Sequence, residues 1–206
     1  MKYFILIFIG LITLVIITSC GLIHTTKGAP TKEQKELMEK YGGIYVFDKK
    51  LRDEIIQREK EREEARQKVT TGDTFWEQIE AIDKNLPQIL SNGYKYSDGL
   101  GYYEKEYEPY YQKIKEYMGE EIFKELKPVI ILTSFYRIKE KDKEKHIPIT
   151  FLVEFTWTIT TYGLYGDEGA GFRFTETRKT GTGGDNIFYL ENGKFIKSNE
   201  KRKDMK

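Results

Sequence analysis

The sequence predicts an α+β protein in which N-terminal helices pack on a C-terminal antiparallel sheet of about four to five strands. Three patterns support this fold class. Apolar residues between positions 75 and 86 recur at the spacing of one helix face. Apolar and polar residues alternate over 149–162, which is typical of an antiparallel strand with one face in water. Asn192-Gly193, between two apolar segments, indicates a tight β-hairpin.

The chain begins with a long apolar segment. No charged residue follows Lys2 in the segment that starts at Tyr3. This segment is long for a signal-peptide core and shorter than the ~20 residues that a spanning helix needs. It ends with an aliphatic residue, a tolerated residue, a small residue and a cysteine. That pattern resembles the lipobox of bacterial lipoproteins, here Ile17, Thr18, Ser19 and Cys20.

The resemblance covers residues 1–20 only, and it implies a location for the protein. Residues 1–19 would be a signal peptide that a lipoprotein signal peptidase removes. Cys20 would carry a diacylglyceryl group, often with a further acyl chain such as palmitate, and two or three such chains anchor a protein firmly. We expect residues 20–30 to be the lipidated terminus and a tether in the bacterial envelope, at the outer membrane if the host has one. The alternative is an uncleaved membrane helix over 3–19.

The composition limits the classes of partner and of chemistry that we expect for the protein. Cys20 is the only cysteine, so its lipidation would leave no thiol for disulfides, redox work or metal binding. Without Lys2, the mature chain has 33 basic against 33 acidic side chains. This balance gives no general attraction to nucleic acid, and we expect no nucleic-acid partner. We also expect no cofactor or metal. A protein partner in the envelope fits better.

Residues 31–72 are expected to form a charged helical region. Thr31 and Gln34 have the spacing of a capping box, which predicts a short helix after them. Residues 44–47 fit either a short strand or a buried turn. Residues 49–68 predict a second helix with few apolar positions, and we interpret its charged face as solvated. A docking or coiled-coil role is the alternative.

Residues 73–198 are expected to form the α+β domain itself. Thr74 and Glu77 have capping-box spacing before the apolar stripe described above, which should face the core. Pro109 suits the first turn of a further helix, and Pro128 should end it.

A tyrosine-rich loop over 91–103 is the best candidate for a partner-binding surface, because tyrosine supplies contact area at low entropy cost. The alternative is that its tyrosines lean on the core. The four tyrosines are Tyr94, Tyr96, Tyr102 and Tyr103.

The rest of the chain predicts strands, followed by a disordered tail over 199–206. The order of elements looks like the cystatin-like and nuclear-transport-factor-like cone folds, in which a curved sheet wraps a helix. No motif supports that similarity. In a cone fold, Phe151, Phe155 and Trp157 could line a ligand pocket, and the alternative is that they are core. The predicted strands cover 129–138, 149–162, 172–179, 187–191 and 194–197.

The sequence contains no decisive catalytic motif. His146 lies among charged residues and is interpreted as a surface residue, and Glu154 is expected to form ordinary ion pairs with Arg173 or Arg178. The glycine-rich segment 180–185 lacks the lysine and the helix start of a phosphate-binding loop.

We therefore predict a lipid-anchored envelope protein with a non-catalytic binding or scaffolding domain. One alternative is an immunity-type lipoprotein that binds a toxin. The other is a hydrolase or isomerase with a cone-fold pocket. An enzyme would show a concave pocket with buried, mutually hydrogen-bonded polar groups, whereas a partner-binding protein would show an exposed tyrosine patch around 91–103.

Overall fold

A computed structural model describes most of the chain. The lipobox residues 17–20, together with Tyr102 and Tyr103, lie outside the described part, so the predictions for them stay predictions. Within the described part, no helix has the length and apolar character needed to cross a bilayer. The described residues are 3, 25–70, 72, 74–101, 105–140, 143–167, 169 and 171–205.

The chain divides into two compact units. Unit 1 consists of Met1–Lys35 and Thr156–Gly181, and unit 2 of Glu36–Phe155 and Thr182–Lys206. The α-helices are α2 (Lys32–Tyr41), α3 (Lys49–Arg66), α4 (Phe75–Asn85), α5 (Glu108–Met118) and α6 (Glu120–Leu126), with short 3-10 helices at Lys105–Tyr107 and Arg202–Met205. The strands are β1 (Thr25–Lys27), β2 (Gly43–Val46), β3 (Tyr96–Gly101), β4 (Val129–Glu140), β5 (Lys143–Asp167), β6 (Gly171–Thr182), β7 (Asn186–Glu191) and β8 (Lys194–Lys201).

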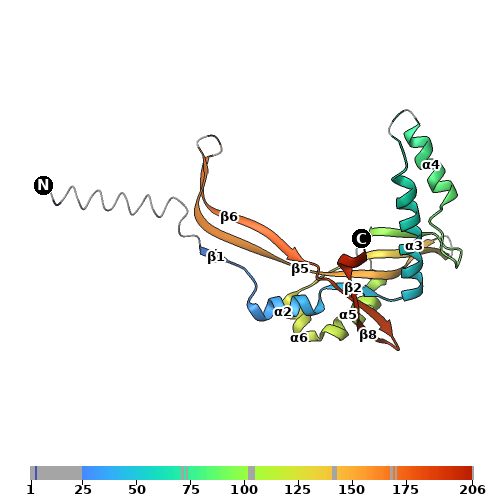
Figure 1. Ribbon diagram of the computed structural model, residues 1–206. Helices are drawn as coiled ribbons and strands as arrows, with labels where there is room; N and C mark the ends of the chain where they lie inside the picture. Colours follow the sequence, from blue (N-terminus) through green and yellow to red (C-terminus); the bar gives the residue numbers. More distant parts are fainter. Residues whose placement is uncertain are drawn as a thin grey trace. The chain divides into compact units, whose positions relative to one another are not determined.

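The α+β class is confirmed, but the predicted sheet was too small and too simple (Figure 1). In the described residues, pairing connects eight strands, and within unit 2 the order is β3-β4-β5-β2-β7-β8. β2 lies between β5 and β7, antiparallel to the first and parallel to the second. The sheet is therefore mixed. A four-residue strand carries too little periodicity to reveal its neighbours from sequence.

Aromatic rings fill the space between α5 and the sheet of unit 2. The ring of Tyr45 stacks on that of Phe188 at 4.5 Å between centroids. Tyr117 of α5 meets the ring of Tyr45 edge-on at 6.0 Å, and Tyr111 meets that of Phe151 at 5.4 Å. Such edge and offset contacts are favourable arrangements of aromatic quadrupoles. Figure 1 shows α5 and α6 on one side of these strands and the α3–α4 hairpin on the other.

β5 corrects the prediction that one face of 149–162 lies in water, but only for the first part of the segment. Further along, Thr156 and Thr158 are exposed as expected. Thr150 and Leu152, expected on the wet face, are buried, as are their neighbours Phe151 and Val153. β4 and β2 flank this part of β5, and both of its faces are covered. Alternation records which side chains share a face, but it does not record whether another element covers the polar face.

Two helices differ from their predictions. The stripe of α4 was expected in the core, yet α4 has no buried residue, and Thr74 makes no side-chain cap bond. The helix expected between Pro109 and Pro128 is broken at Gly119, where φ is 89°. Glycine adopts that conformation without the steric cost that other residues meet.

The C-terminal residues also differ from expectation. Instead of a disordered tail from 199, β8 continues to Lys201 and a 3-10 turn follows. The backbone N–H of Arg202 donates to the carbonyl of Asp185 at 3.0 Å, and that of Lys203 donates to its carboxylate at 2.8 Å. Residues 180–182 belong to β6, so only Gly183, Gly184 and Asp185 of the glycine-rich segment link β6 to β7, and Asp185 also holds the C-terminal turn.

Unit 1 is built from β1, the distal part of β5, and β6. Thr25 pairs with Tyr162 and Lys27 with Thr160, so part of the predicted tether over 20–30 is a strand. Gly28 ends β1 with φ 87°, and a Cβ there would lie 2.1 Å from the carbonyl oxygen of Thr158. Only glycine fits this close approach.

Candidate functional site

A cleft of about 550 Å³ opens in unit 2 between the start of α5 and the β4–β5 hairpin. Its walls are mostly apolar and aromatic, formed by Phe47, Tyr110, Tyr136, Pro148 and Leu190. Charged residues of both signs stand among these walls: Asp48, Glu106, Lys113 and Lys145. An apolar depression with a few convergent polar groups is the usual form of a ligand site.

Local structure explains why the aromatic walls converge. Phe47 directly follows β2, and its N–H donates to the carbonyl of Ile149 at 2.8 Å, which extends the β2–β5 pairing by one bond. Tyr110 stands in the first turn of α5, beside the proline that starts this helix. The rings of Phe47 and Tyr110 meet edge-on at 4.9 Å. One side chain from a strand end and one from a helix start therefore form a single wall.

His146 lies at the cleft and is held from two sides. The hydroxyl of Tyr107 lies 3.2 Å from Nδ1 of His146, and Nε2 lies 3.2 Å from a carboxylate oxygen of Glu144. The imidazole also packs against the ring of Phe135 at 4.6 Å. A neutral imidazole that accepts from Tyr107 and donates to Glu144 satisfies both bonds. The sequence favoured a surface residue here, because the spacing gives no sign of Tyr107, which is 1% exposed.

The tyrosines of 91–103 separate into different environments. Tyr94 is 44% exposed and stacks on Tyr136 at 5.5 Å, so it extends the aromatic wall of the cleft to the surface. Tyr96 is fully buried, and its hydroxyl donates to Glu59 at 2.8 Å. Burial, and then this carboxylate, raise the pKa of Tyr96. The prediction of one exposed loop is wrong for Tyr96, because it belongs to β3 and faces inward.

The predicted pocket of Phe151, Phe155 and Trp157 does not form the cleft. Phe151 and Phe155 are fully buried in the core. Trp157 belongs to unit 1 and is partly buried. Aromatic neighbours surround Phe151, among them Phe47 at 5.6 Å between ring centroids. The alternative interpretation, that the phenylalanines are core, therefore holds for both.

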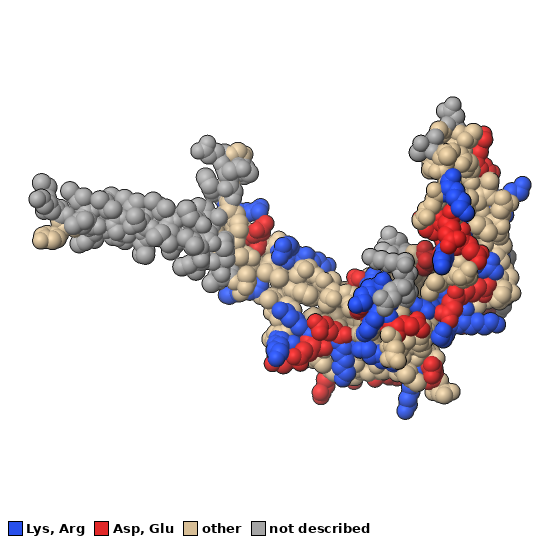
Figure 2. Space-filling model, in the orientation of Figure 1, with Lys and Arg blue, Asp and Glu red and all other residues tan. Residues whose placement is uncertain are grey.

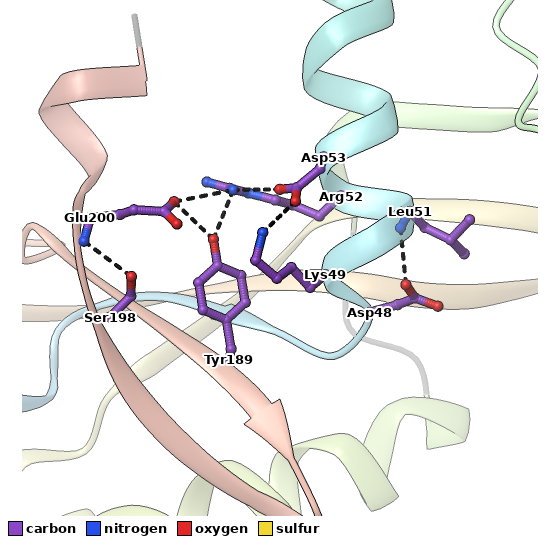
Figure 3. A network of polar contacts seen from close by, with 8 residues as sticks. All are labelled: Asp48, Lys49, Leu51, Arg52, Asp53, Tyr189, Ser198 and Glu200. Atoms are coloured by element: carbon purple, nitrogen blue, oxygen red, sulfur yellow. Dashed lines mark hydrogen bonds and ion pairs between the residues drawn. The ribbon is translucent and has the colours of Figure 1, made fainter.

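Two arginines of the charged helix α3 are buried. The prediction that the charged face of this helix is solvated is therefore wrong for them. Arg52 is buried, and its guanidinium donates to the hydroxyl of Tyr189 at 2.9 Å and to Asp53 at 2.8 Å (Figure 3). Tyr189 in turn donates to Glu200 at 2.8 Å. Burial, and then the bond to Glu200, raise the pKa of Tyr189. This network joins the first turn of α3 to β7 and β8.

Arg62 plays the same part at the other end of α3. It is buried and donates to Asp83 at 2.6 Å and to the carbonyl of Leu86, and both of these groups lie on or just after α4. Its neighbour Glu59 accepts from Gln88 at 2.9 Å as well as from Tyr96. Figure 2 shows acidic and basic side chains interleaved along this hairpin. Paired charges thus connect α3 and α4 beside the half-buried apolar stripe of α4.

None of the remaining sequence candidates lines the cleft. Glu154 belongs to unit 2, whereas Arg173 and Arg178 belong to unit 1, where Arg173 donates to Glu176 at 3.3 Å. Among the residues that the structure describes, no group of three or more metal-binding side chains is placed to hold a metal ion. The cleft, rather than any of these, is the candidate site.

Comparison with known proteins found no relative. No family model, no curated protein and no solved structure matches the chain.

Proposed function

We propose that the protein is a lipid-anchored protein of the bacterial envelope whose unit 2 is a non-catalytic binding domain. The observation that carries the binding role is the aromatic cleft, which continues from Phe47 and Tyr110 through Tyr136 to the half-exposed Tyr94. Aromatic side chains bury large areas and lose little rotamer freedom, so they serve well as contact surfaces.

The chemistry of the cleft defines the partner. Its apolar walls suit one or two apolar side chains of a protein segment. Asp48 and Glu106, against Lys113 and Lys145, select a segment that carries charges of both signs beside those side chains. An envelope protein or a toxin would fit this description, so the immunity-type role stays within the proposal.

The anchor part of the proposal depends on the lipobox. Labelling cells with a fatty-acid probe tests it: the mature protein should carry the label and sediment with membranes. Cys20→Ala should lose both properties. If Cys20→Ala keeps the label and stays in the membrane fraction, the anchor is wrong, whatever the cleft does.

Photo-crosslinking in native membranes tests the cleft. A photoreactive phenylalanine analogue replaces Tyr94 in one strain and Ile196, which is 50% exposed on β8, in a control strain. We expect a discrete adduct from position 94 and not from 196. Tyr136→Ala should weaken the adduct, because Tyr136 joins Tyr94 to the cleft wall. Equal adducts at both positions, or none at 94, would refute the binding role.

A second candidate function is a small-molecule enzyme, and the Tyr107–His146–Glu144 chain favours it. A hydrogen-bonded imidazole at the edge of a cleft is an arrangement suited to general acid–base chemistry. The cone-fold resemblance would place a pocket similarly, and it stays a prediction. In this case His146→Gln should abolish hydrolysis or isomerisation of a bound small molecule while leaving its binding intact.

A further inference from the structure

One face of unit 1 combines large apolar side chains with polar ones. Ile159, Thr161 and Tyr165 of β5 and Glu176 and Arg178 of β6 line one shallow depression of about 340 Å³. Side chains two residues apart on a strand share a face.

Phe174 of β6 therefore lies on the same face as Glu176 and Arg178. Its side chain is 75% exposed, which is unusual for so large an apolar group. By the same rule, the side chains of Trp157 and Ile159 share one face of β5.

The composition of this unit matches the interfacial region of a bilayer. Trp157 and Tyr165 belong to the two residue types that gather at the level of lipid headgroups, and Phe174 adds an exposed apolar ring. On the Phe174 face of β6, Arg178 can pair with lipid phosphate, and Glu176 offsets its charge. The other basic residues of β6, Arg173 and Lys179, alternate onto the opposite face.

Chain length places this face near Cys20. Residues 21–24 separate Cys20 from Thr25, the first residue of β1, and a fully extended segment of that length reaches at most about 18 Å. Thr25 pairs with Tyr162 on β5. The Thr160 and Thr177 hydroxyls lie 3.4 Å apart, so β6 residues near 174 stand level with Tyr162.

Two strand spacings then separate Phe174 from Thr25, which is about 10 Å. A face so close to a lipidated cysteine is within reach of the bilayer surface.

We propose that the Phe174 face of unit 1 docks on the headgroup region of the lipid bilayer beside the anchor. Phe174 inserts between lipids, and Arg178 lies against lipid phosphates. This docking rests on the proposed lipidation of Cys20, since the acyl chains hold the unit at the surface. It would limit how unit 1 turns about its tether.

A single labelled thiol tests the docking. Because lipidation consumes the only native thiol, Phe174→Cys leaves one free thiol for an environment-sensitive fluorophore in the purified lipidated protein. Thr175→Cys is the matched control, since its neighbouring side chain is also exposed but points to the opposite face of β6. Both proteins are reconstituted in vesicles of zwitterionic and anionic lipids with brominated acyl chains.

We expect bromolipids to quench the probe at 174 at least about twofold more than the probe at 175. Equal quenching at both positions, or none at 174, overturns the docking. Quenching that follows the protein-to-lipid ratio instead of the bromolipid content also overturns it, and assigns the face to contact between two copies of the chain.

The lipid anchor and the docking of unit 1 can be refuted independently of each other. Fatty-acid labelling of Cys20 is scored on the same samples, and its absence would refute the anchor alone. In that event the mature chain is held at residue 20 by a histidine tag on nickel-chelating lipid, with Cys20→Ala. The comparison of 174 with 175 is then repeated and decides the docking by itself.

Discussion

The guanidinium of Arg52 lies 2.9 Å from the hydroxyl of Tyr189, a residue 137 positions further along the chain. This bond joins the first turn of α3 to the sheet in a buried position (Figure 3). Asp53 and Glu200 also approach the same nitrogen of Arg52, at 2.8 and 3.4 Å. The positive charge is therefore balanced although it is withdrawn from water, and removing it would leave polar groups without their partner.

Arg52→Ala should lower the free energy of unfolding by about 2–3 kcal/mol, because hydrogen bonds to charged groups are lost and Tyr189 keeps a polar hydroxyl in a buried site. Urea denaturation at neutral pH measures this. Lys50→Ala, at an exposed position of the same helix, is the control and should change little. Equal effects of the two substitutions would show that the network adds no stability.

Acid should weaken the same network through Asp53. Burial acts to raise the pKa of Asp53, but hydrogen bonds from Lys49 and Arg52 outweigh it and hold the pKa below its ordinary value. A carboxyl with a lower pKa in the folded state stabilises the fold above its unfolded pKa, and this contribution disappears as pH falls through the folded pKa.

Unfolding free energies measured between neutral pH and about pH 3 should therefore fall less steeply in Asp53→Asn than in the natural protein. Glu191→Gln, a change at an exposed carboxyl, is the control. An unchanged slope in Asp53→Asn would rule out this linkage.

The bond between Tyr107 and His146 should stabilise the wall of the cleft. Tyr107→Phe removes only the hydroxyl, and we expect a loss of about 1 kcal/mol in unfolding free energy, since the hydrogen bond between this hydroxyl and His146 is then lost. Tyr94→Phe, at a half-exposed position, should change stability by much less. Thermal or urea unfolding distinguishes the two, and a Tyr107→Phe variant as stable as Tyr94→Phe would contradict the expectation.

Arg62 should hold α4 on α3. Because α4 has no buried residue, we expect the bonds from Arg62 to Asp83 and to the carbonyl of Leu86 to matter for its attachment to α3. Arg62→Ala should speed amide hydrogen exchange in α4 at least about tenfold while β5 stays protected. Lys60→Ala, exposed on the same helix, is the control. Uniform acceleration in α4 and β5 would instead indicate global destabilisation.

Local signals in the sequence predicted local structure well. The N–H of Thr31 donates to Gln34 at 3.0 Å and the N–H of Gln34 donates to Thr31 at 3.2 Å, as a capping box requires. Asn192 and Gly193 both have positive φ in the turn between β7 and β8, as predicted for the hairpin. In both cases, all the groups that decide the structure lie within a few residues of one another.

Local signals of this kind could not predict the candidate site. The cleft joins the end of β2, the start of α5 and the β4–β5 hairpin, and none of these segments marks its neighbours by spacing. The pairing of Tyr107 with His146 spans 39 positions. Of the tyrosines predicted to bind a partner, only Tyr94 is described as exposed, and it is connected to the cleft through Tyr136, which sequence reasoning did not single out.

By itself, the sequence determined the fold class, the cap at Thr31, the turn at Asn192-Gly193 and the prediction of a lipid anchor at Cys20, because each of these depends on the types and order of neighbouring residues. The tertiary structure decided which polar residues are buried and where the cleft lies. Arg52, Arg62 and Tyr96 are buried beside distant partners that accept hydrogen bonds from them. Burial of a polar group depends on a partner, and the chain brings such partners together only by folding.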